Sequence, residues 1–231
     1  KLLFHYSQEE VDRLVSLMAE YGYKAAQELA EMACEESGFG RIESKKEKNI
    51  FATRDVYRYI KDIKTVGIIH QDMERNVYDV ATPMGIVAAI IPVTNPTSTA
   101  LFKILISIKA RCAIVLSPHP RGVRCTQAAA NTMKRAISAI GAPEGMIGCL
   151  TLPTMAATQE LMKHPDIAVI LATGGSGLVQ AAYSSGKPAI GVGPGNVPAY
   201  IEKTADIEHA VRCLVASQTF DWGTICASEQ A

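Results

Sequence analysis

The sequence predicts an α/β protein built on an open, doubly wound, mostly parallel sheet. Two observations predict this class: short apolar runs recur along the chain, and segments of helical length separate them. The runs are continuous rather than alternating, which is typical of parallel strands that helices cover on both faces. The runs occupy residues 85–91, 113–116, 147–150, 167–171 and 189–192. The helical segments occupy residues 98–109, 126–140, 156–163 and 177–183.

The region before the first apolar run is predicted to be mainly helical. Ser7 and Glu10 have the spacing of a capping box, and apolar residues follow them at helical intervals. A second helix is expected over residues 24–36, where a Ser-Gly pair ends it. Residues 41–49 carry charges of both signs, and we expect a solvated connector there.

The composition argues against several classes of function. The 231 residues include 23 Lys plus Arg and 23 Asp plus Glu, so neither a nucleic-acid nor a membrane partner is expected. No apolar run approaches the roughly 18 residues of a membrane span, and the start lacks the features of a secretory signal. The six cysteines form no C-x-x-C pair, which argues against a zinc site or a disulfide framework and favours a reducing, cytoplasmic compartment.

Four loops rich in Gly, Pro, Ser and Asn follow predicted strands. Ligands of doubly wound sheets bind outside the carboxyl ends of the strands. Because these ends lie along one rim of the sheet, we expect the functional residues to gather there. The four loops comprise residues 92–96, 117–121, 173–176 and 191–196.

Asn95, in the first of these loops, has two interpretations. It can cap the helix that begins near Pro96, a common role for Asn. Alternatively, its carboxamide NH₂ can stabilise an oxyanion without introducing a charge. The residues alone favour the cap and leave the second role open.

Two glycine-containing loops also admit two interpretations each. Residues 171–177 are predicted to form the end of a strand, a glycine turn and the start of a helix, an arrangement that can bind a phosphate group. The sequence lacks the full G-x-G-x-x-G pattern, however. A plain strand-to-helix turn is equally compatible with these residues. Residues 191–196 hold three glycines and lead into another apolar run. The glycines can allow the backbone to pass close to a reacting group. An irregular loop without such a role is the alternative, and the residues alone favour it.

Cys226 follows a predicted helix at 207–218 and a Gly-containing loop that holds the single Trp. Backbone N–H groups in such a loop can favour a nucleophilic thiolate. A buried Cys at the head of a strand is the alternative, and the residues alone favour that alternative.

In this order, the loops resemble those of the aldehyde dehydrogenase superfamily, most closely its CoA-acylating branch. That branch includes the aldehyde dehydrogenase half of bifunctional aldehyde/alcohol dehydrogenases. The last two of the matching stretches are specific to the branch. The stretches are TPMGIVAAIIPVTNPTSTALFKILISIKARCAIVLSPHPR (82–121), HPDIAVILATGGSGLVQAAYSSGKPAIGVGPGNVPAYI (164–201) and TFDWGTICASEQ (219–230).

The resemblance implies that Cys226 attacks the aldehyde carbonyl and then carries the acyl group as a thioester. Asn95 and the backbone N–H of Cys226 would hold the oxyanion. NAD is the implied hydride acceptor, with NADP left open, and coenzyme A is the implied co-substrate. No metal is expected. The residues expected to bind the cofactor are Pro92, Val93, Thr94, Ser117, Pro118, His119, Thr173, Gly174, Gly175, Gly191 and Gly193.

Two departures from the hydrolytic branch refine this expectation. Hydrolytic members carry a Glu general base in the loop at 191–196, where this sequence has Gly191 at the matching position and no carboxylate. A water nucleophile needs a positioned base, whereas a CoA thiol does not, so thiolysis is favoured over hydrolysis. The ribose-binding Lys and Glu of the hydrolytic branch are also missing from the loop at 117–120, which weakens the preference for NAD over NADP.

The resemblance also implies a domain organisation. Family members are considerably longer, so we expect this chain to be a truncated part that is inactive alone. The full-length enzyme is expected to be a homo-oligomer, with an alcohol dehydrogenase domain as a possible fusion partner. The implied parts are a helical N-terminal segment at 1–75, a Rossmann-like core at 76–218 and the start of a catalytic domain at 219–231.

Three other functions compete with oxidation of acetaldehyde to acetyl-CoA. A charged aldehyde such as sulfoacetaldehyde would need a basic side chain in the substrate pocket. Hydrolytic oxidation to a free acid is disfavoured by the empty base position at Gly191. A non-catalytic nucleotide-binding or assembly module is the third alternative, and it would have no reason to keep Cys226 more reactive than the other thiols.

Overall fold

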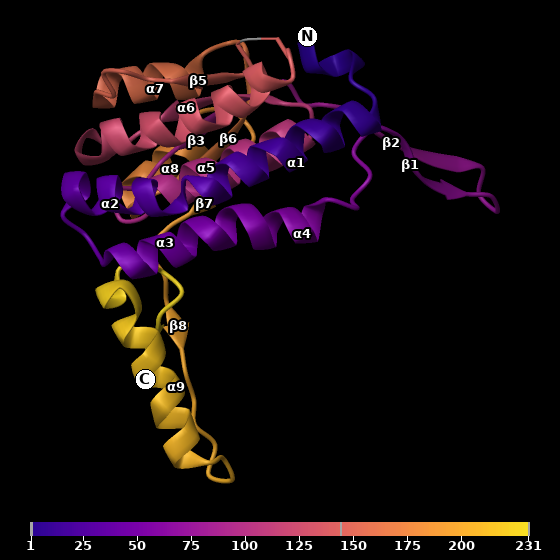
Figure 1. Cartoon of the computed structure of the whole chain (residues 1–231). Helices are drawn as coiled ribbons and strands as arrows, with labels where there is room; N and C mark the ends of the chain where they lie inside the picture. Colours follow the sequence, from indigo (N-terminus) through magenta and orange to yellow (C-terminus); the bar gives the residue numbers. More distant parts are fainter. Residues whose placement is uncertain (1, 144, 231) are drawn as a thin grey trace.

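The computed structural model describes residues 2–143 and 145–230 and confirms the predicted α/β class (Figure 1). Its centre is a five-stranded parallel sheet in the order β5-β4-β3-β6-β7. The first strand of this sheet along the chain, β3, is therefore central, and the winding direction reverses between β3 and β6. Such a reversal is the usual binding position on an open sheet. The strands are β3 (Ile86–Ile90), β4 (Ala113–Ser117), β5 (Ile147–Cys149), β6 (Ile167–Thr173) and β7 (Ala189–Val192).

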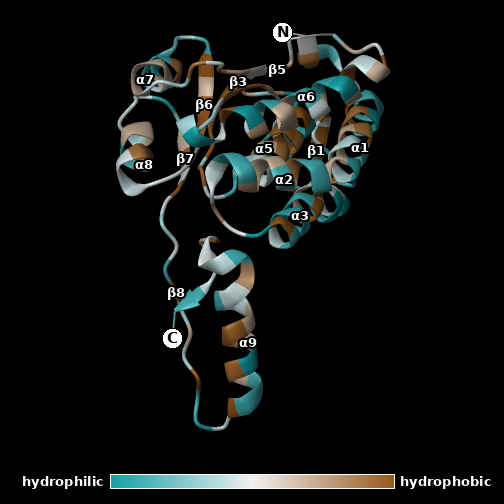
Figure 2. Ribbon diagram, turned by 60° about the vertical axis from the view of Figure 1, so that its left-hand side comes forward, coloured by the Kyte–Doolittle hydropathy of each residue, from teal (hydrophilic) through white to brown (hydrophobic). Residues whose placement is uncertain are grey.

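Helices cover both faces of this sheet. Along β3, Val87 and Ala89 pack with α5 and α6, whereas Ala88 and Ile90 pack with α7 and α8. This alternation follows the two-residue period of a strand that is buried on both faces. Figure 2 shows the hydrophobic residues concentrated in these strands and in α5. The four helices are α5 (Pro96–Lys109), α6 (Val123–Ala139), α7 (Met155–Lys163) and α8 (Ser176–Tyr183).

A second helical layer, formed by α1 (Gln8–Lys24) and α2 (Ala26–Ser37), lies over α5 and α6. The predicted capping box is present: Ser7 Oγ accepts from the Glu10 N–H at 3.2 Å, and Glu10 Oε2 accepts from the Ser7 N–H at 2.8 Å. The second helix ends at Gly38, whose left-handed φ of 72° favours glycine. Two short 3₁₀ turns precede helices of these layers: η1 (Leu2–His5) comes before α1, and η3 (Pro120–Gly122) comes before α6.

The segment that was expected to be a solvated connector is instead a helix, α3 (Ile42–Ile50), so that prediction is wrong. One face of α3 is buried, and it includes the side chains of Lys45 and Lys48. These charges can be buried because they pair with Asp221, far along the chain. The helix continues through the π-helical turn η2 (Phe51–Asp55) into α4 (Val56–Ile60).

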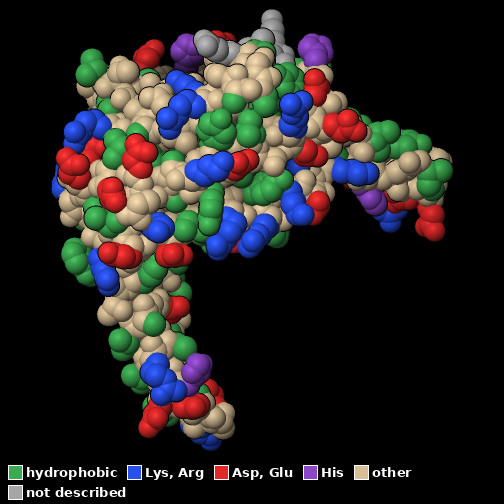
Figure 3. Space-filling view, viewed as in Figure 1, with side chains coloured by type: hydrophobic (Ala, Val, Ile, Leu, Met, Phe, Trp, Pro, Cys, Tyr) green, Lys and Arg blue, Asp and Glu red, His purple; other side chains and the backbone are tan. Residues whose placement is uncertain are grey.

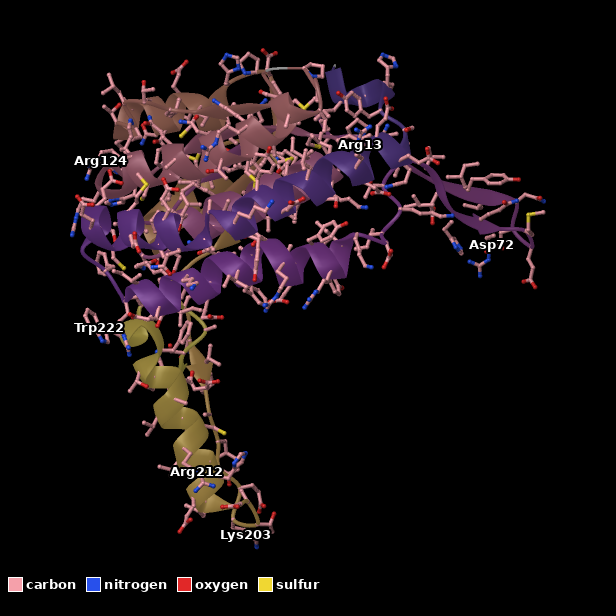
Figure 4. All side chains as sticks on the ribbon, in the orientation of Figure 1. Arg13, Asp72, Arg124, Lys203, Arg212 and Trp222 are labelled. Carbon is pink, nitrogen blue, oxygen red and sulfur yellow. The ribbon has the colours of Figure 1, made fainter. Side chains whose placement is uncertain are left out.

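Two projections leave the central block (Figures 1 and 3). One is the antiparallel hairpin of β1 (Gly67–Asp72) and β2 (Val77–Ala81), which begins inside the segment that was expected to be helical. The other, here called the arm, comprises residues 197–230. Every residue of its helix α9 is at least partly exposed, and Figure 4 shows Lys203 and Arg212 toward its far end. The arm contains β8 (Val197–Pro198), α9 (Ile207–Thr219), η4 (Phe220–Gly223) and β9 (Glu229–Gln230).

Within the two described ranges, none of the helices combines the length and apolarity needed to cross a membrane.

Candidate active site

A pocket of about 720 Å³ lies at the carboxyl ends of β3, β4 and β6 and extends to the base of the arm. It brings together every predicted site residue except Gly191. Gly191 instead packs on α8, where an added Cβ would lie 2.5 Å from Val179 Cγ1. The predicted residues that line the pocket are Asn95, Cys226, Pro92, Val93, Thr94, Ser117, Pro118, His119, Thr173, Gly174, Gly175 and Gly193.

Cys226 differs from the other cysteines in its surroundings. All six are described and free, and Cys226 is the one that lines the pocket, with an exposed side chain. Burial raises the pKa of the Cys125 thiol to about 12 and that of the Cys149 thiol to about 11. Because a thiolate is the reactive form, burial makes those two thiols poor nucleophiles. The structure therefore disagrees with the interpretation of Cys226 as a buried strand residue.

The glycine-rich loop at 191–196 passes directly beside Cys226. An added Cβ on Gly195 would lie 2.6 Å from the carbonyl carbon of Cys226 and 2.9 Å from its Cα. Side chains essentially never approach backbone that closely, so only glycine fits. Gly195 therefore provides backbone clearance beside Cys226, while the reacting role of that cysteine stays a prediction.

Asn95 occupies the N-cap position of α5, but its side chain bonds elsewhere. Its Oδ1 accepts from Lys48 Nζ at 2.7 Å, and its Nδ2 donates to Thr94 Oγ1 at 3.2 Å. The carboxamide therefore does not perform the capping role that the residues alone favour. It lies instead in the wall of the pocket that contains Cys226.

A buried polar cluster, which sequence reasoning missed, supports this wall from behind. Its centre is the carboxylate of Asp221, which is completely buried and pairs with both Lys45 and Lys48. Lys45 Nζ also donates to the Thr94 carbonyl at 2.7 Å. Lys45 and Lys48 are three residues apart, which places them on one helix face, but their partner is 173 or more residues away.

Asp221 takes an uncommon backbone conformation to reach this position. Its φ is 51° and that of Trp222 is 53°, both in the left-handed region that non-glycine residues rarely adopt. Figure 4 shows Trp222 where the arm meets the central block. The Asp221 carboxylate accepts from the Arg41 N–H at 2.7 Å and from Thr224 Oγ1 at 2.5 Å. Burial alone would raise the pKa of Asp221, but these hydrogen bonds and the lysines hold it below its ordinary value.

The glycine turn after β6 has the features of an anion-binding turn. Gly175 is the N-cap of α8, and a Cβ added to it would have none of the surrounding residues within 4 Å. Backbone N–H groups at such a helix start attract phosphate oxygens. An added Cβ on Gly174 would meet Leu178, so the turn also packs closely on its own helix.

The loop after β4 forms the opposite end of the pocket. His119 Nδ1 accepts from the Arg121 N–H at 3.1 Å, which gives this ring a structural role in the turn. Burial and the neighbouring Arg121 lower the pKa of His119, so the ring stays neutral near pH 7. Ser117 Oγ is 2.8 Å from the hydroxyl of Thr158, and both residues are buried.

Lys103 of α5 joins the strands at the point where the sheet reverses direction. Its buried Nζ donates to the carbonyls of Ile90, at the end of β3, and Leu171, on β6, at 2.8 and 2.7 Å. Burial lowers the pKa of Lys103 to about 7. The lysine thus holds β3 and β6 together directly below the pocket.

Comparison with known proteins identifies the family. Residues 4–230 match the aldehyde dehydrogenase family. The chain belongs to that family. The predicted resemblance to its acylating branch is confirmed, because the similar proteins include acetylating and bifunctional aldehyde dehydrogenases.

Three relatives of this aldehyde dehydrogenase chain show the extent of the similarity. The bifunctional aldehyde-alcohol dehydrogenase of Escherichia coli K12 is 50% identical over 226 residues, which are 98% of this chain and 25% of that protein. The structure of an acetylating aldehyde dehydrogenase from Geobacillus thermoglucosidasius is 59% identical, with a TM-score of 0.96, over 98% of this chain and 50% of that one. A propionaldehyde dehydrogenase from Rhodopseudomonas palustris with bound propionyl-CoA is 30% identical, with a TM-score of 0.85, over 98% of this chain and 50% of that one. This chain therefore spans half or less of the length of each.

The pocket of this aldehyde dehydrogenase chain is uncharged. Within the described residues, no Asp, Glu, Lys or Arg side chain lines it. The lining combines proline, glycine and small apolar residues with a few hydroxyl and amide groups. No carboxylate that could act as a general base for water therefore lines the part of the wall that these residues form, and none stands in the loop at 191–196.

Proposed function

We propose that this chain supplies the cofactor-binding region and the nucleophile of a CoA-acylating aldehyde dehydrogenase. The proposed reaction converts a short aldehyde, CoA and NAD⁺ to an acyl-CoA and NADH. The observation that carries the proposal is the position of Cys226: its exposed thiol shares a pocket with Asn95 and the glycine turn, and no carboxylate of the described residues lines that pocket.

Cys226 is proposed to form the covalent intermediate. The sulfur of its thiolate form bonds to the aldehyde carbon, and the carbonyl π electrons move to oxygen, giving a thiohemiacetal alkoxide. The Asn95 NH₂ and the backbone N–H of Cys226 are proposed to donate to this oxygen. An amide donor suits the task because it stabilises the developing charge in a water-poor site.

Several features of the pocket fit a nicotinamide dinucleotide. The turn at Thr173, Gly174 and Gly175 offers backbone N–H groups at the start of α8, which suits a pyrophosphate. The loop at 117–119 lines the other end of the pocket and suits the adenosine. Bound NAD⁺ supplies the hydride acceptor that turns the thiohemiacetal into a thioester. NADP remains a second candidate, since no acidic side chain of the described lining opposes a 2′-phosphate.

The thioester on Cys226 is proposed to be released by CoA. Transfer of the acyl group to the CoA thiol breaks the bond between the acyl carbon and Cys226, and it returns the cysteine to its starting state. Water attack would need a positioned base, and no carboxylate of the described lining offers one. Within the described residues, the lining carries no Asp, Glu, Lys or Arg, which suits a short neutral aldehyde such as acetaldehyde better than a sulfonated one.

The domain assignment and the larger assembly belong to the same proposal. We assign residues 1–75 to a mainly helical segment that ends with β1, 76–218 to the nucleotide-binding core and 219–231 to the start of the catalytic domain. A homo-oligomer, a cytoplasmic location and fusion to an alcohol dehydrogenase domain are proposed for the whole enzyme. The bifunctional E. coli relative supports the fusion.

The decisive measurement is steady-state NADH formation by the full-length enzyme with acetaldehyde and NAD⁺, with and without CoA. Strict dependence on CoA is the expected result. Equal rates without CoA would show that water accepts the acyl group and would overturn thiolysis. If no NADH forms, the assay is repeated with sulfoacetaldehyde and with NADP⁺. Failure of all combinations would favour a non-catalytic module.

A further inference from the structure

We propose that Lys48, held by Asp221, is a positioning residue that fixes the Asn95 carboxamide with its NH₂ group toward the reaction pocket. This inference rests on the proposed role of Asn95 as an oxyanion donor. Lys48 lies on α3, outside the pocket lining, and its buried side chain approaches Asn95 from behind. It therefore acts through Asn95 rather than on the substrate.

The chemistry of the lysine determines the orientation of the amide. An ammonium group carries three donors and no acceptor, so it can bind only the oxygen of a carboxamide. Lys48 Nζ lies 2.7 Å from Asn95 Oδ1, and this contact excludes the flipped amide. The NH₂ group must then point to the other side, where Thr94 Oγ1 accepts one hydrogen at 3.2 Å. The second hydrogen remains available for a substrate oxygen.

The bond from Lys48 should also make Asn95 a stronger donor. Hydrogen bonds in series polarise one another, and a cation bound to the amide oxygen draws electron density from the nitrogen. Asn95 thereby transmits part of the electrostatic stabilisation that the Lys48 ammonium would give an oxyanion. The ammonium itself stays buried behind Asn95, outside the pocket.

Asp221 links this amide to the cysteine segment. Its carboxylate binds Lys48 and also accepts from Thr224 Oγ1 at 2.5 Å. Thr224 lines the pocket two residues before Cys226. One buried carboxylate therefore fixes both the proposed oxyanion donor and the segment that carries the proposed nucleophile.

The charge balance of the cluster allows Lys48 to be replaced without leaving Asp221 unpaired. Two lysines share the single carboxylate of Asp221, and Lys45 Nζ lies 3.3 Å from it. Replacing Lys48 leaves the pair of Lys45 and Asp221 intact, so no buried charge loses its only partner. The carboxylate also keeps its bonds from Arg41 and Thr224.

The test is a double-mutant cycle in the full-length enzyme, read as the single-turnover rate of NADH formation from aldehyde and NAD⁺. Lys48→Met should lower this rate by about 10- to 100-fold, because misplacing a catalytic group has effects of that size. The dissociation constant for NAD⁺ should change by less than about twofold, since Lys48 is not among the residues that line the pocket. In an Asn95→Ala background, Lys48→Met should have almost no further effect.

Lys46→Met is the matched control, because Lys46 lies on the same helix but is partly exposed. It should leave the rate unchanged. An unchanged rate in Lys48→Met, or an equal loss with and without Asn95, would overturn the inference. If Lys48→Met does not fold, Lys48→Gln replaces it in the cycle with the same expected non-additivity. Failure of the proposed function is distinguishable, since it appears in the wild-type enzyme as missing or CoA-independent NADH formation.

Discussion

The two sides of the pocket are held in place by different interactions. On the sheet side, the loops follow strands whose residues are buried among apolar neighbours on both faces. On the cysteine side, residues 220–230 belong to an exposed arm and are positioned by the Asp221 cluster, by the pairing of β8 with β9 and by the close contact at Gly195. The proposed cofactor site and the proposed nucleophile therefore have separate structural supports, and substitutions should affect them separately.

Cys226→Ala tests that separation most strongly. It should abolish CoA acylation in the full-length enzyme, because the proposed thioester cannot form, while the sheet side still binds nucleotide. Steady-state activity and NAD⁺ titration measure the two effects. Cys213→Ala is the control, since Cys213 is also exposed but lies on α9 outside the pocket. Acylation that persists in Cys226→Ala would remove the central proposal.

Gly195→Ala acts at the junction between the two sides. The new Cβ would collide with the backbone of Cys226, so the cysteine must move relative to the sheet. A displacement of that kind should lower the rate of acylation by about 100-fold. Gly177→Ala, where the space around the glycine is open within 4 Å, should have little effect. Similar rates for the two variants would contradict the close contact.

Lys103→Met affects the sheet side and should change stability with a specific pH dependence. The pKa of Lys103 is lowered to about 7 in the folded protein, so the unfolded chain binds more protons above pH 7. The free energy of unfolding of the wild type should therefore rise between pH 7 and 9, relative to Lys103→Met, by on the order of 2 kcal/mol. Urea unfolding of the full-length enzyme at both pH values measures this difference. Parallel pH dependences in the two proteins would contradict a buried lysine with a lowered pKa.

The sheet side could be predicted from the sequence in nearly every respect. Continuous apolar runs identified all five parallel strands, and the residues after them line the pocket. This succeeded because burial on both faces leaves a local signal in the sequence. Gly191 is the exception: the same glycine-rich loop contains Gly195, which contacts Cys226, and Gly191, which packs on α8.

The cysteine side could be predicted only in part. The resemblance points to Cys226, which lines the pocket, and its role as nucleophile stays a prediction. The prediction of a solvated connector at 41–49 is wrong, since a local run of charges does not reveal a counter-charge 173 residues away. The helical spacing of Ser44, Lys45, Lys48 and Asn49, which share one buried face, is the signal that could have indicated a helix. The hairpin at 67–81 was missed because its strands are largely exposed and leave no apolar run.

The distance along the chain between Lys48 and Asp221 has a consequence for biosynthesis. At about 5–20 residues per second, a ribosome needs roughly 10–30 s to proceed from the lysine to its carboxylate partner. During that interval the two ammonium groups of α3 must remain hydrated, so α3 can complete its docking only after the arm has been made. The growing chain can thus assemble its sheet early, whereas the buried cluster behind Asn95 can form only after Asp221 has been synthesised.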